Sequence, residues 1–125
     1  MLEISKTTKR NPPSGIPFVS IKEKILGKKY ALSLVFIGDD KAKKLNLSHK
    51  NKNYPTNVLA FPLDKNEGEI FINLVRAERD HKKYEQNLKK HVAYLFIHAC
   101  LHLKGYEHGS TMEDEEKKIL RQFHL

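Results

Sequence analysis

Residues 98–108 read His98-Ala-Cys-Leu-His102-Leu-Lys-Gly105-Tyr-Glu-His108 and place three imidazoles at positions i, i+4 and i+10. On a helix, His98 and His102 lie one turn apart on the same face, so both can reach one ion. Gly105 can adopt the left-handed conformation that ends a helix, after which the chain turns and brings His108 back. Three neutral nitrogen ligands with a fourth position open predict a catalytic zinc site that holds one ion per chain.

The residues around the two helical histidines are apolar. From Val92 to Leu103 the chain is apolar all round except for His98 and His102, which predicts a helix buried on most sides. A histidine in such a helix must find a partner or bear a desolvation cost. The alternative is a pair of hydrogen-bonded core histidines with an unrelated surface His108. Three histidines at this spacing around a helix-ending glycine favour the metal site.

Ala99 limits the chemistry of this predicted site. Metzincin proteases share the histidine spacing, but they carry a glutamate as general base directly after the first histidine. That position is Ala99 in this chain. Alanine cannot accept a proton, so peptide hydrolysis by that route is disfavoured, and the base must come from elsewhere.

Length and composition predict a single soluble domain over residues 1–125, with 39% apolar and 30% charged residues. The longest apolar run is too short to cross a bilayer, and the first residues lack the apolar core of a signal peptide. A lone cysteine, Cys100, excludes an internal disulfide, predicts no disulfide-linked partner and fits a reducing cytoplasm. We expect Cys100 to be a core thiol that points away from the histidine face.

The positive charge lies in the first part of the chain. Residues 1–53 hold 12 Lys/Arg against 4 Asp/Glu, whereas residues 54–125 hold 11 of each kind. Such a basic segment suits a polyanionic partner, because phosphate contacts give salt-sensitive affinity. A lysine-rich surface without a nucleic-acid partner is the alternative, since charge asymmetry alone is only a hint.

Strand and helix signals alternate early in the chain, and helices dominate later. Strands are predicted at 2–5, 30–37, 58–61 and 69–72, and helices at 18–25, 39–47, 73–84, 87–104 and 110–123. Asn73 and Asn87 can cap two of these helices, and Ser110 with Glu113 forms a possible capping box for the last. The expected fold is a single α+β domain with a small sheet flanked by helices and a metal site at the end of a buried helix.

Two segments resemble a known family. The first is His98-x-x-x-His102-Leu-x-Gly-Tyr-x-His108. The second comprises Leu45-Asn46 and the run from Pro55-Thr56-Asn57-Val58 to Pro62, followed by Gly68-Glu69-Ile70. In sequence, order and separation they resemble the YbeY family of metal-dependent endoribonucleases, and the resemblance covers nearly the whole chain.

The resemblance implies a mixed sheet of about four strands surrounded by helices, with His98, His102 and His108 as zinc ligands. The implied activity is cleavage of single-stranded RNA in maturation of small-subunit ribosomal RNA and in ribosome quality control. The implied partners are therefore single-stranded RNA, ribosomal RNA and the ribosome or its small subunit, with no membrane partner.

Two departures from the family pattern concern the predicted catalytic residues. Lys50 aligns with the family's catalytic arginine; it keeps the positive charge but lacks the planar fork that binds phosphate through two hydrogen bonds. Glu107 replaces the usual aspartate before the third histidine. Glu107 could orient a metal ligand, act as base or face solvent, and we expect the first of these.

The sequence also gives expectations for residues outside the metal motif. Thr56 and Asn57 are expected to shape a turn that can line the cleft, and Tyr106 to pack near the helix end or stack a base. The histidines outside the motif are expected at the surface: His49, His81, His91 and His124. Two alternative functions remain open: a ribosome-associated factor in which the metal is mainly structural, and another zinc hydrolase.

Overall fold

The computed structural model describes residues 1–52 and 56–125. In chain order the elements are β1 (Leu2–Lys6), α1 (Phe18–Leu26), β2 (Ala31–Ile37), α2 (Asp39–Lys50), β3 (Val58–Asp64), β4 (Glu67–Asn73), α3 (Leu74–Asp80), the 3₁₀ helix η1 (His81–Tyr84), α4 (Leu88–Lys104) and α5 (Ser110–Gln122). The strand order is β1-β2-β4-β3, with the first two pairings parallel and β3–β4 antiparallel. The predicted α+β fold with a four-stranded mixed sheet is confirmed.

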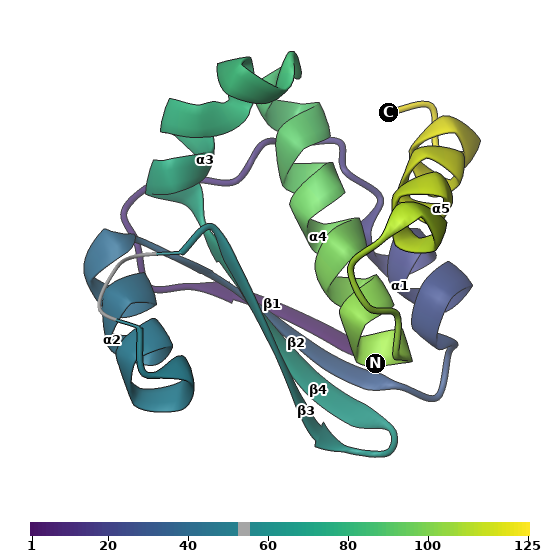
Figure 1. Ribbon diagram of the computed structural model, residues 1–125, viewed down its shortest axis with the longest axis horizontal. Coiled ribbons are helices and arrows are strands. Elements are labelled where there is room, and N and C mark those ends of the chain that lie inside the picture. Colours follow the sequence, from purple (N-terminus) through teal and green to yellow (C-terminus); the bar gives the residue numbers. More distant parts are fainter. Residues whose placement is uncertain (53–55) are drawn as a thin grey trace.

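Helix α4 occupies the centre of the molecule. It contacts β3 and β4 on one side and α1 and α5 on the other, whereas α2 lies across the sheet from it (Figure 1). Alternate residues of the central strands are completely buried, among them Leu34 in β2 and Ile70 and Ile72 in β4. This period-two burial is what a sheet packed on a helix requires. The core therefore lies between the sheet and α4, and it fixes the helix that carries two of the three histidines.

The ends of α4 follow the sequence signals. Asn87 caps the start, because its side chain accepts a hydrogen bond from the backbone N–H of Lys90 at 2.8 Å. Gly105 ends the helix in the left-handed conformation, with φ +112°, as expected for a residue without a Cβ. Cys100 is buried in this helix, and burial raises the pKa of its thiol well above the usual value. The prediction of a core cysteine is confirmed.

Several predictions differ from the structure, and among them the helix predicted at 39–47 extends to Lys50 and the strand predicted at 69–72 begins at Glu67. Strand β3 continues through Pro62, and the hairpin closes over Lys65 and Asn66; β3 is an edge strand, where a residue without an N–H is tolerated. The helix expected over 73–84 divides into α3 and η1. The capping box at Ser110 is wrong: Ser110 is the first residue of α5 and Gly109 is its N-cap, without a side-chain hydrogen bond.

None of the helices in residues 1–52 and 56–125 combines the length and the apolar content that crossing a membrane would require.

Gly68 in β4 is expected to be intolerant of a side chain. A Cβ at this position would collide with the hydroxyl of the buried Tyr30 and lie 3.2 Å from both terminal carbons of Leu103. We expect Gly68→Ala to lower the free energy of unfolding by about 1–3 kcal/mol, the usual cost of overpacking. Gly38→Ala is the matched control, because a Cβ there would meet its nearest neighbour at 3.7 Å. Chemical denaturation measures both variants, and equal stabilities for the two would contradict the prediction.

Candidate metal centre

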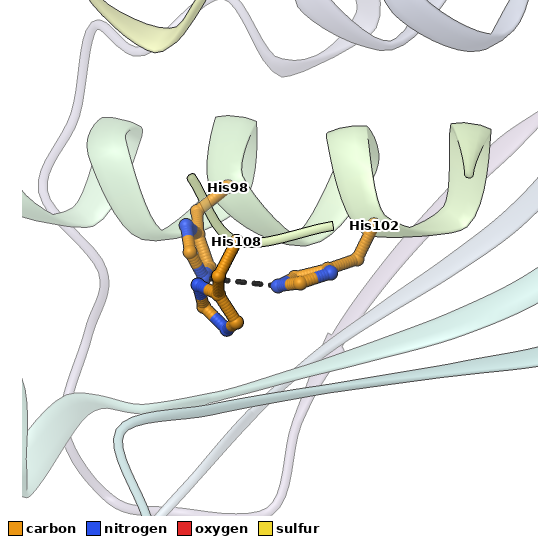
Figure 2. A group of neighbouring side chains, drawn as sticks. All are labelled: His98, His102 and His108. Atoms are coloured by element: carbon orange, nitrogen blue, oxygen red, sulfur yellow. Dashed lines mark hydrogen bonds between the residues drawn. The ribbon is translucent and has the colours of Figure 1, made fainter. Parts of the chain in front are cut away.

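The three histidines of the motif converge on one point. His98 and His102 project from the same face of α4, and His108 approaches from the segment after Gly105 (Figure 2). The Nε2 atoms of His98 and His102 are 3.2 Å apart, and one ring nitrogen from each of the three residues lies within 4.8 Å of the others. The 3.2 Å separation of the two Nε2 atoms is close to that expected of nitrogens that share an ion at about 2.0–2.1 Å.

Hydrogen bonds on the far sides of two rings fix their tautomers. Nδ1 of His98 lies 2.5 Å from a carboxylate oxygen of Glu116, and Nδ1 of His102 lies 3.2 Å from the backbone carbonyl oxygen of Tyr106. Both oxygens are acceptors, so Nδ1 carries the proton in each neutral ring and Nε2 presents a lone pair. Neither Nε2 can then donate to the other across the 3.2 Å contact. A shared cation satisfies both, and the residues present therefore fit a divalent metal ion.

The electrostatic environment favours the neutral, ligating form of His102. Burial lowers the pKa of this imidazole below its usual value, and the neighbouring His98 and His108 lower it further. A metal ligand must be unprotonated, so these effects act in the direction that metal binding needs.

Glu116, which positions His98, is a functional residue that the sequence analysis missed. Its side chain is buried on α5, and α5 packs against α4. The signal was present in the pattern, because Glu116 lies on the apolar face formed by Met112, Ile119 and Leu120. A carboxylate in the middle of an apolar stripe needs a partner, and histidine supplies one here.

Glu107 occupies a different place from the one expected. It is exposed, and in the described part of the chain it neither lines the cavity at the histidines nor forms a hydrogen bond with one of them. Glu116, which the sequence analysis did not select, makes the hydrogen bond that orients His98. Tyr106 also lies outside this cavity; it is half-buried and packs against the core.

The histidines line a cavity of about 620 Å³. Its walls come from the start of β3 and the residues before it, including Thr56 and Asn57, and from α4 and α5. Lys50, the last residue of α2, lines the same cavity. The cavity therefore combines three imidazoles with a cation from the basic part of the chain. Pro55, part of the motif quoted above, lies outside the described residues.

The tyrosine Tyr94 also lines this cavity, one turn before His98 on α4, and its ring centre is 5.9 Å from that of His98. Burial, followed by the nearby carboxylate of Glu116, raises the pKa of Tyr94 to about 12. The phenol therefore stays protonated near neutral pH and is available as a hydrogen-bond donor.

Comparisons with known proteins agree on one family. The family model described as "Endoribonuclease YbeY" matches residues 13–124. Proteins of that name from Mesoplasma florum and from the Aster yellows witches'-broom phytoplasma are each 33% identical, over 87% and 86% of this chain and 68% and 80% of their own lengths. The protein of that name from Phytoplasma mali is 44% identical over 71% of this chain and 61% of its own.

The fold comparison extends over almost the entire chain. The solution structure of a Thermotoga maritima protein matches with a TM-score of 0.69 and 25% sequence identity, covering 98% of this chain and 89% of that one.

Proposed function

The chain belongs to the YbeY endoribonuclease family, and on that premise we propose that it is a zinc-dependent endoribonuclease that cleaves single-stranded RNA. The observation that carries the proposal is the pair of hydrogen bonds that leave Nε2 of His98 and of His102 unprotonated. These two atoms face each other at 3.2 Å beside His108, in a cavity that Lys50 also lines. We propose His98, His102 and His108 as the ligands of one zinc ion per chain.

The proposed cellular role follows the family. We propose that the RNA substrate is ribosomal RNA of the small subunit, that the protein acts in its maturation and in ribosome quality control, and that it does so in the cytoplasm. The excess of positive charge in residues 1–53 supports a ribosomal partner, because ribosomal RNA is a dense polyanion.

The proposed mechanism assigns roles to this chain's own side chains. A bound zinc ion would supply Lewis-acid activation of water and of a phosphoryl oxygen. Lys50 neutralises the negative charge that develops on the phosphate of the RNA. The protonated phenol of Tyr94 donates a hydrogen bond to the RNA bound in the same cavity. Glu116 holds the ring of His98 in the orientation that turns Nε2 into the cavity. Ala99, which also lines the cavity, cannot transfer a proton.

Removal and restoration of the metal test the proposal. Purified protein treated with a chelator should lose cleavage of a labelled single-stranded RNA, and zinc should restore it, whereas Mg²⁺ should not, because Mg²⁺ prefers oxygen ligands. The melting temperature and the metal content of each sample are measured in parallel. Protein that binds zinc, unfolds on chelation and never cleaves RNA would support a structural metal in a ribosome-associated factor. Zinc-dependent peptidase activity would support another hydrolase.

A further inference from the structure

We propose that Tyr84 is a stacking platform for a nucleobase of the RNA bound at the metal centre. The inference rests on the proposed function, and it adds a substrate contact distant in sequence from the histidine motif. Tyr84 is the last residue of η1 and lines the same cavity as His98 and Lys50. Its side chain has the combination that base stacking needs: a large aromatic ring that is supported on one face and remains half-exposed.

The support comes from His91. The rings of Tyr84 and His91 are stacked, with centres 5.0 Å apart and planes inclined by 29°. Tyr84 nevertheless keeps 50% of its surface exposed. One face of the ring is therefore held by the protein while much of the side chain is open to a ligand.

His91 is a rigid support, and its place corrects the expectation of a surface histidine. It is completely buried, and its Nδ1 lies 2.9 Å from the side-chain oxygen of Gln86. The ring of Tyr94 is also close to that of His91, with ring planes inclined by 27° and centres 6.2 Å apart. Because His91 cannot move without disturbing the core, the ring of Tyr84 is held in place before any substrate binds, which lowers the entropic cost of stacking.

The same aromatic series connects the platform to the metal centre. From Tyr84 the next ring centre toward the histidines is that of Tyr94, at 6.3 Å, and from Tyr94 the centre of His98 is at 5.9 Å. A strand whose phosphate lies over the histidines can therefore place a nearby base against Tyr84. Tyr106, the residue at which the sequence suggested base stacking, lies outside this cavity.

Exposed lysines close to the platform in sequence, and Lys50 in the cavity, can contact the phosphates of a nucleic-acid strand. Lys82 and Lys83 precede Tyr84 in η1 and are exposed, and Lys83 is paired with Asp80 at 3.3 Å. Lys50 lines the cavity together with the carboxylates of Glu113 and Glu116. Aromatic faces combined with a positively charged groove are the features by which proteins bind single strands without sequence preference. The substrate contact inferred here therefore requires a base but does not discriminate strongly among bases, because every base has a π-face.

The experiment compares Tyr84→Ala with Tyr84→Phe, which keeps the ring and removes only the hydroxyl. Binding is measured with a short phosphorothioate-linked single-stranded RNA that resists cleavage and carries one 2-aminopurine, a base whose fluorescence falls on stacking. Tyr84→Ala should weaken binding by about 5- to 150-fold and reduce the fluorescence quenching, whereas Tyr84→Phe should match the wild type. Val19→Ala, which shortens another exposed apolar side chain on α1, is the control.

A second arm replaces single bases of the RNA by abasic sites. At the stacked position the abasic change should weaken binding to the wild type and leave binding to Tyr84→Ala unchanged, a coupling that a folding defect in the variant would not produce. Equal binding and quenching in the wild type and Tyr84→Ala overturn the inference, as does a wild type that tolerates an abasic site at every position. If the wild type cleaves RNA, the proposed function stands whether or not Tyr84→Ala weakens binding. If the wild type neither binds nor cleaves RNA, both the proposed function and the stacking role of Tyr84 are overturned.

Discussion

Replacing His102 by alanine is expected to abolish RNA cleavage and to reduce the zinc content of the purified protein. The substitution removes one of three converging nitrogens and the hydrogen bond to the carbonyl oxygen of Tyr106. Changes to residues that only hydrogen-bond a metal ligand cost about 10- to 100-fold in metal affinity or activity, so loss of a ligand itself should exceed that range. Cleavage of a labelled single-stranded RNA and metal analysis measure the effect.

The control is His124→Asn, a change to an exposed histidine outside the cavity. Asparagine tolerates the left-handed backbone found at this position, where φ is 59°. A contaminating nuclease would cut equally in all preparations, so only the difference between variants counts. Equal cleavage by the wild type and a folded His102→Ala variant would exclude a catalytic metal at this centre.

Glu116 offers a graded version of the same test. Glu116→Gln keeps the size of the side chain and removes the charge that favours a protonated Nδ1 on His98. Zinc affinity should fall by about 10- to 100-fold with the fold retained. Glu113→Gln is the matched control, because Glu113 lies in the same helix and lines the same cavity but is exposed. Similar affinities for the two variants would mean that the buried carboxylate does not position the ligand.

The contrast between His98 and Glu116 shows what the sequence could predict. The pairing of His98 with His102 follows from helical periodicity, and the return of His108 follows from the conformational freedom of Gly105. These are local rules that act within one stretch of chain. The structure places the three residues together as those rules predict.

Glu116 could not be assigned in the same way, because its role depends on how α5 packs against α4, a contact between elements. His91 illustrates the same limit. Its polar neighbours in sequence at the start of α4 predict an exposed side chain, whereas in the structure the ring of Tyr84 and the side chain of Gln86 cover it. The continuation of β3 through Pro62 depends on the position of that strand at the sheet edge, which only the strand order reveals. Local sequence predicts the ligands, and tertiary packing decides which side chains orient them.

Replacing Lys50 is the second substitution for which we expect a large effect on RNA cleavage. Lys50→Ala should lower kcat for RNA cleavage by about 10²- to 10³-fold, the usual cost of removing one group that stabilises developing negative charge. Lys50 is the last residue of α2 and its side chain is exposed, so the change should have little effect on stability. Steady-state kinetics on single-stranded RNA at several salt concentrations measures the effect, and the loss of one phosphate contact should also make the salt dependence of binding less steep.

Lys50→Arg should keep the activity or raise it, because guanidinium binds two phosphate oxygens through a planar fork where ammonium acts as a point charge. Lys44→Ala is the matched control: Lys44 is exposed on the same helix but is not among the residues that line the cavity. The Lys44→Ala variant shows what the loss of any positive charge on α2 does, so the remaining effect of Lys50→Ala is due to the charge of Lys50 in the cavity. If Lys50→Ala and Lys44→Ala reduce cleavage equally, Lys50 acts only through the general field of the basic segment. If only Lys50→Ala does so and arginine restores the rate, the charge acts on the phosphate inside the cavity, next to the three histidines.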